Sequence, residues 1–191
     1  MERVDLITIK ISGKMLWQKF HICDADYITN KCKGRCCEGR EGISVVVHES
    51  EVARISSYGV VIEAGFIKRD NRNRCPFKQN DGLCGIHDDK PFGCNASPFT
   101  VNDNGMIIIR NRYRLFCCYK DLPSVPAFES HKRSLLKIFG EEEVDNIISQ
   151  VNNHLDIIVS KISSYNYKVL MDNHICRKRI NGGKYATTPM F

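Results

Sequence analysis

The stretch CPFKQNDGLCGIHDDKPFGC, residues 75–94, holds three cysteines in twenty residues, with turn-forming Gly, Asp and Pro residues between them. It lies within a longer segment, 68–98, that shows no helical or strand pattern. A structureless segment of that length inside a compact domain needs something to tie it down. Its thiols can form disulfides, bind a metal or remain free, and the rest of the sequence bears on this choice.

The composition favours a metal over disulfides. The chain has 191 residues, 42% hydrophobic and 26% charged, which suits a folded protein with a real core. The N-terminus MERVDLITIK carries acidic residues where a signal peptide needs a basic patch and an apolar run, and the longest apolar runs are too short to cross a bilayer. We therefore expect a cytoplasmic protein without a membrane segment. In that reducing compartment, clustered thiols favour metal binding.

The first two thirds of the chain predict short strands, one helix and long loops. Residues 3–12 alternate apolar and polar side chains like a half-buried strand, and 43–47 (ISVVV) resemble a short buried strand. Residues 23–42 read as a loop. The segment 48–59 predicts a brief helix with acidic residues in its first turn and Gly59 near its end. Asn104-Gly105 between two β-type runs predicts a hairpin.

The last third predicts helices. One helix is expected from Pro126 to a stop at Gly140, and a second from the acidic run at 141–143 to about residue 175. Apolar spacings of three and four favour the second helix. They hold at Val144, Ile147, Ile148, Val151, Leu155, Ile158, Val159 and Ile162. We expect this stripe to pack on the cysteine-rich part; a dimer interface is the less favoured use.

The expected fold class is therefore α+β. It is a small, loop-rich, cysteine-stapled domain with a few short strands and a C-terminal helical hairpin or arm. The boundaries we expect are a metal-binding domain over residues 1–124, a helical arm packing on it over 125–178, and a flexible tail over 179–191.

Ten cysteines stand out in the composition, and eight of them lie between residues 32 and 118. These eight are the candidate metal ligands, namely Cys32, Cys36, Cys37, Cys75, Cys84, Cys94, Cys117 and Cys118. No C-x2-C knuckle is present, so the spacing is not that of a common zinc finger. Adjacent residues of an extended chain face opposite ways, so each vicinal pair favours one member at a metal and the other at a second metal or the core. One four-thiolate centre and two centres both fit.

Within these alternatives, Cys36 is the favoured partner of the three thiols in 75–94. The isolated Cys23 and Cys176 are expected to be buried free thiols, since free cysteine is a small, commonly buried residue. His87 follows Cys84 by three residues, and we expect it to pack or hydrogen-bond locally rather than to act as a ligand.

The net charge of +6 gathers in three basic runs, at 68–74, 110–114 and 177–179. Solvated surface is the favoured interpretation. The run RNRYR at 110–114, interpreted as a basic strand, also fits a site for nucleic acid, because Arg and Tyr alternate in it.

With these residues assembled, the chain resembles the CxxCxxCC family of cysteine-cluster proteins, described as zinc- or iron-chelating. The match runs from about residue 30 to 118 and is strongest over 75–99, with Cys-Pro-Phe, Gly-x-Cys-x-Ile and Pro-Phe elements. The full CxxCxxCC motif is absent: Thr29 stands near the place of the first cysteine, and Cys32 is offset from the second. The resemblance implies binding of zinc, iron or an iron–sulfur cluster.

Three functions follow, in order of preference. The first is a metal-binding protein that coordinates zinc, iron or an iron–sulfur cluster through cysteines, with a structural or redox role. The second is a metal- or cluster-dependent enzyme that modifies a protein or peptide, which would make such a molecule the partner. The third is a zinc protein that binds nucleic acid, the least favoured partner. Whether the chain is an enzyme, and which residues would be catalytic, stays open at this point.

Overall fold

The computed structural model describes residues 5–38, 46–119 and 121–181. Its centre is a four-stranded mixed sheet with the strand order β5-β6-β1-β8. β1 pairs with β8 in antiparallel register along its whole length and with β6 in parallel, and β5 and β6 form an antiparallel hairpin. The prediction of an α+β fold is confirmed.

The elements are as follows in chain order. The strands are β1 Leu6–Ser12, β2 Lys19–Phe20, β3 Ile62–Glu63, β4 Phe66–Ile67, β5 Phe99–Val101, β6 Ile107–Ile109, β7 Val125–Pro126 and β8 Ile157–Ser163. The α-helices are α1 Gly13–Leu16, α2 Ala25–Tyr27, α3 Glu49–Ser56, α4 Phe92–Asn95, α5 Ala127–Ser130, α6 Lys132–Phe139, α7 Glu141–Asn152 and α8 Ser164–Asn181. A π-helical turn, η1 Ile28–Cys32, and the 3-10 turns η2 Arg35–Cys37, η3 Asn111–Leu115 and η4 Cys117–Tyr119 complete them.

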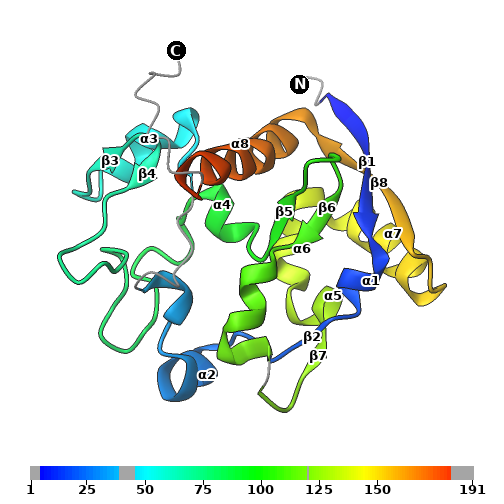
Figure 1. The fold of residues 1–191 in the computed structure, drawn as a ribbon, viewed down its shortest axis with the longest axis horizontal. Helices are drawn as coiled ribbons and strands as arrows, with labels where there is room; N and C mark the ends of the chain where they lie inside the picture. The colour runs from blue at the N-terminus through cyan, green and yellow to red at the C-terminus, as the bar shows by residue number, and fades with distance from the viewer. Residues whose placement is uncertain (1–4, 39–45, 120, 182–191) are drawn as a thin grey trace.

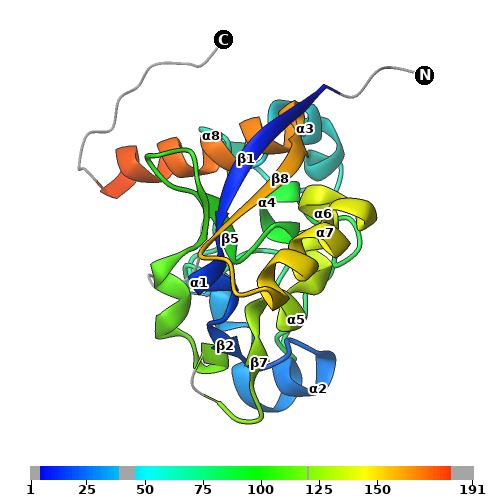
Figure 2. The same cartoon turned by 90° about the vertical axis from the view of Figure 1, so that its right-hand side faces the viewer.

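Helices cover both faces of the central sheet. In Figure 1, α8 runs beside β5 in the upper part of the picture, while α6 and α7 lie behind the sheet. The view turned by 90° separates these layers, with α8 on one side of β1 and β8 and with α5, α6 and α7 on the other (Figure 2). The sheet is therefore the middle layer of the larger, more regular half of the molecule.

The predicted second helix, from 141 to about 175, is wrong in its middle. α7 ends at Asn152, and the chain then forms β8, which pairs with β1 from Ile157 to Ser163. Ile158 and Ile162, counted in the apolar stripe, are buried on one face of β8, whereas Val159 is exposed. Ile158 and Ile162 are four residues apart, a spacing that places them on one face of a helix and also on one face of a strand. Pairing with β1 provides hydrogen-bond partners for the backbone of this stretch, and its β-branched residues favour a strand.

Several other local predictions are confirmed. The strand at 3–12 is β1, α3 lies within 48–59, and Gly140 ends α6 with a positive φ of 83°. Residues 102–106 turn between β5 and β6, and Gly105 has a φ of 73° there. The predicted helix after Pro126 forms as two pieces, α5 and α6, which are separated at His131.

Other local predictions are wrong or fall outside the described residues. The segment 23–42 is not a plain loop, because α2, η1 and η2 lie in it. The run RNRYR is not a strand, because most of it forms the 3-10 turn η3. The predicted strand at 43–47 lies largely outside the described residues, although Val46 makes a bridge to Phe66. The expected tail lies mostly outside them as well.

The apolar core is divided unequally. A large cluster spans the sheet, its helices and the segment around α2, and it includes Cys32 and Cys118. A small cluster, built on Val47, Ile55 and Ile86, holds together the loop-rich part that carries Cys84. Because β8 from the 125–178 segment pairs with β1, both of the expected domains contribute to one sheet. The small cluster alone is a weak anchor for the long loop around residues 68–91.

Within the described parts of the chain, no helix combines the length and apolar character that spanning a bilayer requires.

Candidate metal centre

Four cysteines from three separate segments come together in the loop-rich part. Cys37 ends η2, Cys75 and Cys84 flank the turn of the 75–84 loop, and Cys94 lies in α4. The four thiols lie near enough to interact electrostatically. Negative charge on Cys37, Cys75 or Cys84 raises the pKa of Cys94. The four are referred to below as the first thiol group.

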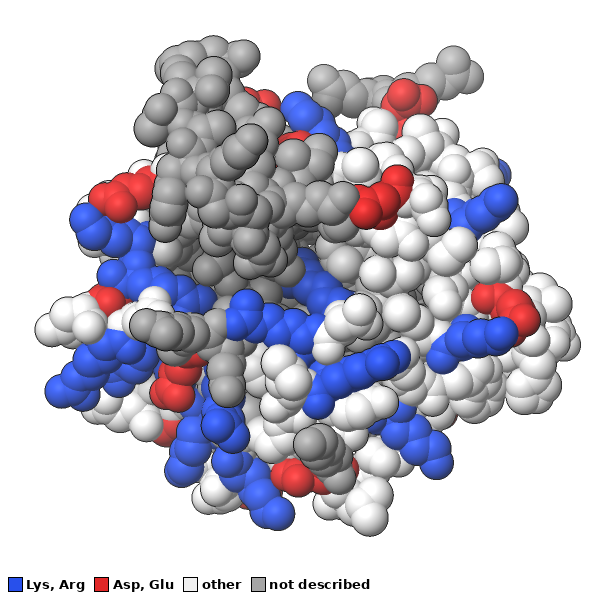
Figure 3. All heavy atoms as spheres, viewed as in Figure 1, with Lys and Arg blue, Asp and Glu red and all other residues white. Residues whose placement is uncertain are grey.

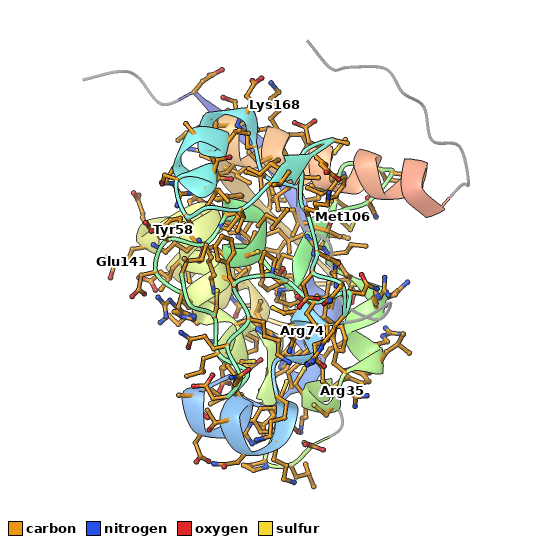
Figure 4. The ribbon with its side chains drawn as sticks, turned by 90° about the vertical axis from the view of Figure 1, so that its left-hand side faces the viewer. Arg35, Tyr58, Arg74, Met106, Glu141 and Lys168 are labelled. Atoms are coloured by element: carbon orange, nitrogen blue, oxygen red, sulfur yellow. The ribbon has the colours of Figure 1, made fainter. Side chains whose placement is uncertain are left out.

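Backbone hydrogen bonds fix the positions of these segments. The Cys75 amide donates to the Cys37 carbonyl at 2.9 Å, which joins two loops separated by more than thirty residues. Lys78 and Cys84 form an antiparallel bridge, so Cys75 and Cys84 stand on the two arms of one narrow loop. Figure 4 shows the side of the molecule on which Arg35 and Arg74, close in sequence to Cys37 and Cys75, both lie.

Backbone amides point at the sulfur atoms in this group. The Phe77 amide donates to the Cys75 sulfur and the Ile86 amide to the Cys84 sulfur, two residues further on in each case. A neutral thiol is only a weak acceptor, while a thiolate accepts N–H groups strongly. Both amides therefore favour the thiolate form of the sulfur that they face.

Without a cation at the group, the thiols resist ionisation. Burial raises the pKa of Cys75 to about 11 and also raises the pKa of Cys84 and Cys94. A hydrogen bond that the Cys37 thiol makes with its neighbour Cys36, followed by burial, raises the pKa of Cys37. A cation that accepts four thiolates would displace these protons, which is how thiol sites bind metals.

Cationic side chains surround the first thiol group. The nearly buried ammonium of Lys78 pairs with Glu38 and partly offsets the rise in the pKa of Cys37. Lys90 likewise partly offsets the rise in the pKa of Cys84 and Cys94. Arg69 also favours the thiolate forms of Cys37 and Cys75. Four thiolates with one divalent ion carry a net charge of minus two, and these cations offset it.

Arg110 adds an independent sign that negative charge belongs here. Its side chain is buried, with 6% of the residue exposed, and its Nε and Nη2 atoms have no hydrogen-bond partner among the described residues. Burial lowers the pKa of Arg110, while the nearby Tyr113 and Cys94 oppose that shift. An unpaired buried guanidinium is strongly unfavourable. A thiolate at Cys94 would compensate it.

The two members of the vicinal pair 36–37 lie in different surroundings. The sequence favoured Cys36 as the partner of the three thiols in 75–94; the structure brings Cys37 to them. Cys36 instead packs against the large apolar core, with its sulfur 4.0 Å from that of Cys37.

The remaining predicted ligands lie elsewhere. Cys32, Cys117 and Cys118 gather near α2 together with Cys23, which the sequence interpreted as an isolated thiol. Cys23 is exposed rather than buried. Cys176 lies in the part of α8 whose side chains are outside the described ones. Cys23 is near Cys32 of η1 and also near Cys117 of the distant turn η4, and sequence spacing carried no signal for the second contact.

His87 makes its side-chain hydrogen bond to a residue distant in sequence, not to a local partner. Its Nε2 lies 2.9 Å from Nη1 of Arg133, and the ring is exposed. Burial, together with the positive charges of Lys90 and Arg133, lowers the pKa of His87.

The side chains are not yet arranged around a single ion. Among the described residues, no three Cys, His, Asp or Glu side chains take up coordinating positions together. The donor set nevertheless fits the ions expected here, since soft thiolates select zinc and iron–sulfur clusters. Binding would require the thiols to turn inward on a backbone that already holds them close.

The basic surface is spread out rather than gathered. Lys and Arg side chains are frequent over the middle and lower parts of the face in Figure 3, with acidic side chains among them. Of the arginines in RNRYR, Arg112 and Arg114 are exposed, whereas Arg110 is buried and cannot reach a nucleic acid.

Comparison with known proteins identifies the cysteine-rich segment. The model of the CxxCxxCC family, described as a "putative zinc- or iron-chelating domain", matches residues 29–114. No curated protein matches the chain, and no solved structure does. The match includes Cys37 and the three cysteines of 75–94, and it confirms the resemblance seen in the sequence. Residues 29–114 are therefore similar to a CxxCxxCC domain, and its description supports metal binding in general.

Proposed function

We propose that this protein binds zinc or an iron–sulfur cluster through the thiolates of the first thiol group. The observation that carries the proposal is the convergence of Cys37, Cys75, Cys84 and Cys94 from three separate segments, with backbone amides that favour the thiolate forms of Cys75 and Cys84. Four thiolates match the ligand count of a closed structural zinc site and of a cubane cluster.

The primary role we propose is to hold the loop-rich half together. The small core around Val47, Ile55 and Ile86 supplies little apolar burial. A structural zinc site contributes ~10–16 kcal/mol of apparent binding energy in small zinc peptides. That is comparable to the net stability of a whole domain, so metal binding would order the 68–91 loop. An iron–sulfur cluster would add the capacity for electron transfer.

The enzyme hypothesis is less well supported. Reactive cysteines have lowered pKa values. Here the pKa is raised at Cys23, Cys32, Cys37, Cys75, Cys84, Cys94 and Cys118. Raised values favour ligands that ionise only on a metal over free nucleophiles. A protein or peptide partner and a cytoplasmic location stay predictions, and the free state of the nine described cysteines is consistent with a reducing compartment.

Anaerobic purification tests the proposal. Zinc, iron and acid-labile sulfide are measured together with the absorption spectrum, in the wild type and in Cys84→Ser and Cys36→Ser variants. We expect Cys84→Ser to lose metal and Cys36→Ser to keep it, since Cys36 packs on the core. A wild-type protein that neither contains nor takes up zinc or iron would contradict the proposal, as would full metal content in Cys84→Ser.

A further inference from the structure

The antiparallel pair β1–β8 carries apolar side chains on a face that meets solvent. Burial alternates along both strands, so one face packs into the core and the other is exposed. Leu6, Ile157 and Val159 lie on the solvent side, where they are 55%, 44% and 47% exposed. One exposed apolar residue is ordinary on a protein surface, whereas several on one face indicate an interaction site.

The strand register places two lysines on the same face. Lys10 stands opposite Val159, and Lys161 stands opposite Thr8. Residues that oppose each other across an antiparallel pair project to the same side, and both lysines are exposed there. The face that carries Leu6, Lys10, Ile157, Val159 and Lys161 is called the outward face below.

Among the described residues, no helix or strand covers the outward face. α7 contacts β8 from the buried side, and α8 covers the sheet at β5, at the other end of the strand order. In Figure 1, β1 and β8 lie in front of α7 with no described element before them. Figure 3 has the same view and shows mainly uncharged surface there, with isolated charged side chains. The outward face is therefore open to a partner.

The free edge of β8 is closed to a further strand. The side chain of Gln150 in α7 accepts a hydrogen bond from the Val159 amide at 3.0 Å and donates one to the Val159 carbonyl at 2.7 Å. Glu143 Oε2 accepts a hydrogen bond from the Lys161 amide at 3.0 Å. These are the backbone groups through which an edge strand would recruit another strand. A partner therefore has to contact the outward face through side chains.

The charges on the outward face favour an acidic partner over a second copy of this chain. Among the described residues, neither Lys10 nor Lys161 has a salt bridge. Glu143 lies near Lys161, but its Oε2 accepts hydrogen bonds from the Ser160 hydroxyl and the Lys161 amide instead. A two-fold dimer through this face would place the same lysines on both sides of the contact, where like charges repel.

We propose that the outward face binds another protein through an amphipathic helix. The apolar stripe of that helix covers Ile157 and Val159, and carboxylates beside the stripe pair with Lys10 and Lys161. β1 has 7 residues and spans about 20 Å at about 3.3 Å per residue. About 13 residues of helix have that length, and a helix binds through its side chains without needing a strand edge. This interaction goes beyond metal binding and does not depend on it.

Fluorescence anisotropy with two synthetic helical peptides of about 13 residues tests this inference on the full-length protein. Both peptides carry a stripe of leucines at helical spacing, flanked by glutamates in one peptide and by lysines in the other. We expect the protein to bind the glutamate peptide and not the lysine peptide. Lys10→Glu/Lys161→Glu should weaken binding of the glutamate peptide about tenfold and confer binding of the lysine peptide.

Lys132→Glu/Lys137→Glu is the matched control, because both lysines are exposed on α6 and the net charge changes by the same amount. It should leave the binding of both peptides unchanged. Val159→Ser should weaken binding of the glutamate peptide, whereas Leu115→Ser, at an exposed apolar position in η3, should not. Circular dichroism shows whether each variant keeps its fold.

Several results would overturn the proposal. Binding of neither peptide would do so, as would equal weakening in the two charge-reversed variants. A wild-type dimer that Val159→Ser dissociates in sedimentation would assign the face to a second copy instead. Cosedimentation with phosphatidylserine vesicles that Lys10→Glu/Lys161→Glu abolishes would assign it to a membrane. Should a variant misfold, acetylation of the wild type with and without the glutamate peptide, read by mass spectrometry, decides the matter. The proposal requires that the peptide protect Lys10 and Lys161, and unchanged labelling of both would exclude it.

Discussion

Replacing Gly34 with alanine should disrupt the contact that joins the cysteine loops. Gly34 has a φ of +62°, and a Cβ atom there would lie 2.3 Å from the Gly82 carbonyl oxygen. The left-handed conformation costs about 1–2 kcal/mol for a residue with a Cβ. Forcing extra volume into a packed site typically adds about 1–3 kcal/mol. Both partners are backbone, so neither can rotate away, and we expect a total loss of about 2–5 kcal/mol.

Gly59→Ala is the matched control. Gly59 has a φ of +78°, and nothing lies within 4 Å of a Cβ built there. It should lose only the conformational part, about 1–2 kcal/mol. The difference between the two variants, about 1–3 kcal/mol, isolates the contact with Gly82. If that difference falls on the metal-bound form alone, zinc affinity drops by about 5- to 150-fold.

Urea unfolding of both variants with and without zinc measures these differences, and competition with a chromophoric chelator measures zinc affinity. Gly34→Ala should be the less stable variant and the weaker zinc binder. Equal unfolding free energies for Gly34→Ala and Gly59→Ala would refute the reasoning. The close approach of the two loops would then carry no energetic weight.

Three further predictions concern charge, pH and the fold. Arg110→Met should weaken zinc binding, measured by chelator competition, because it removes a buried positive charge near Cys94. The stability of the metal-free protein, measured by urea unfolding, should stay the same or rise, because an apolar chain replaces a buried guanidinium without a charged partner. Arg112→Met, at an exposed position, should change neither quantity. Burial raises the pKa of Cys75 from 9.0 to about 11 in the folded state, so the unfolding free energy of the metal-free protein should fall between about pH 9 and pH 11. Zinc affinity should rise with pH over the same range, because the thiols must lose their protons to bind. A stability that does not change with pH in this range would count against buried thiols. Ile158→Ala should cost about 2–5 kcal/mol and Ile157→Ala, which is 44% exposed, less than 1 kcal/mol by urea unfolding; equal losses would argue against β8 as a strand.

The sequence by itself determined the features that depend on neighbouring residues. Alternation in 6–12 specified a half-buried strand, and Asn104-Gly105 specified a hairpin turn, because both depend on local backbone geometry. Gly140 ended its helix for the same reason. The excess of clustered cysteines indicated a metal-binding family, since that signal lies in residue type and order.

Tertiary structure alone decided what depends on pairing between distant segments. The apolar residues of 155–162 fit a helix and a strand equally well, and the β1 edge selected the strand. The order of cysteines along the chain likewise allowed one centre or two. The approach of Cys37 to the 75–84 loop and Cys94 follows from contacts between distant segments, and sequence spacing does not encode such contacts.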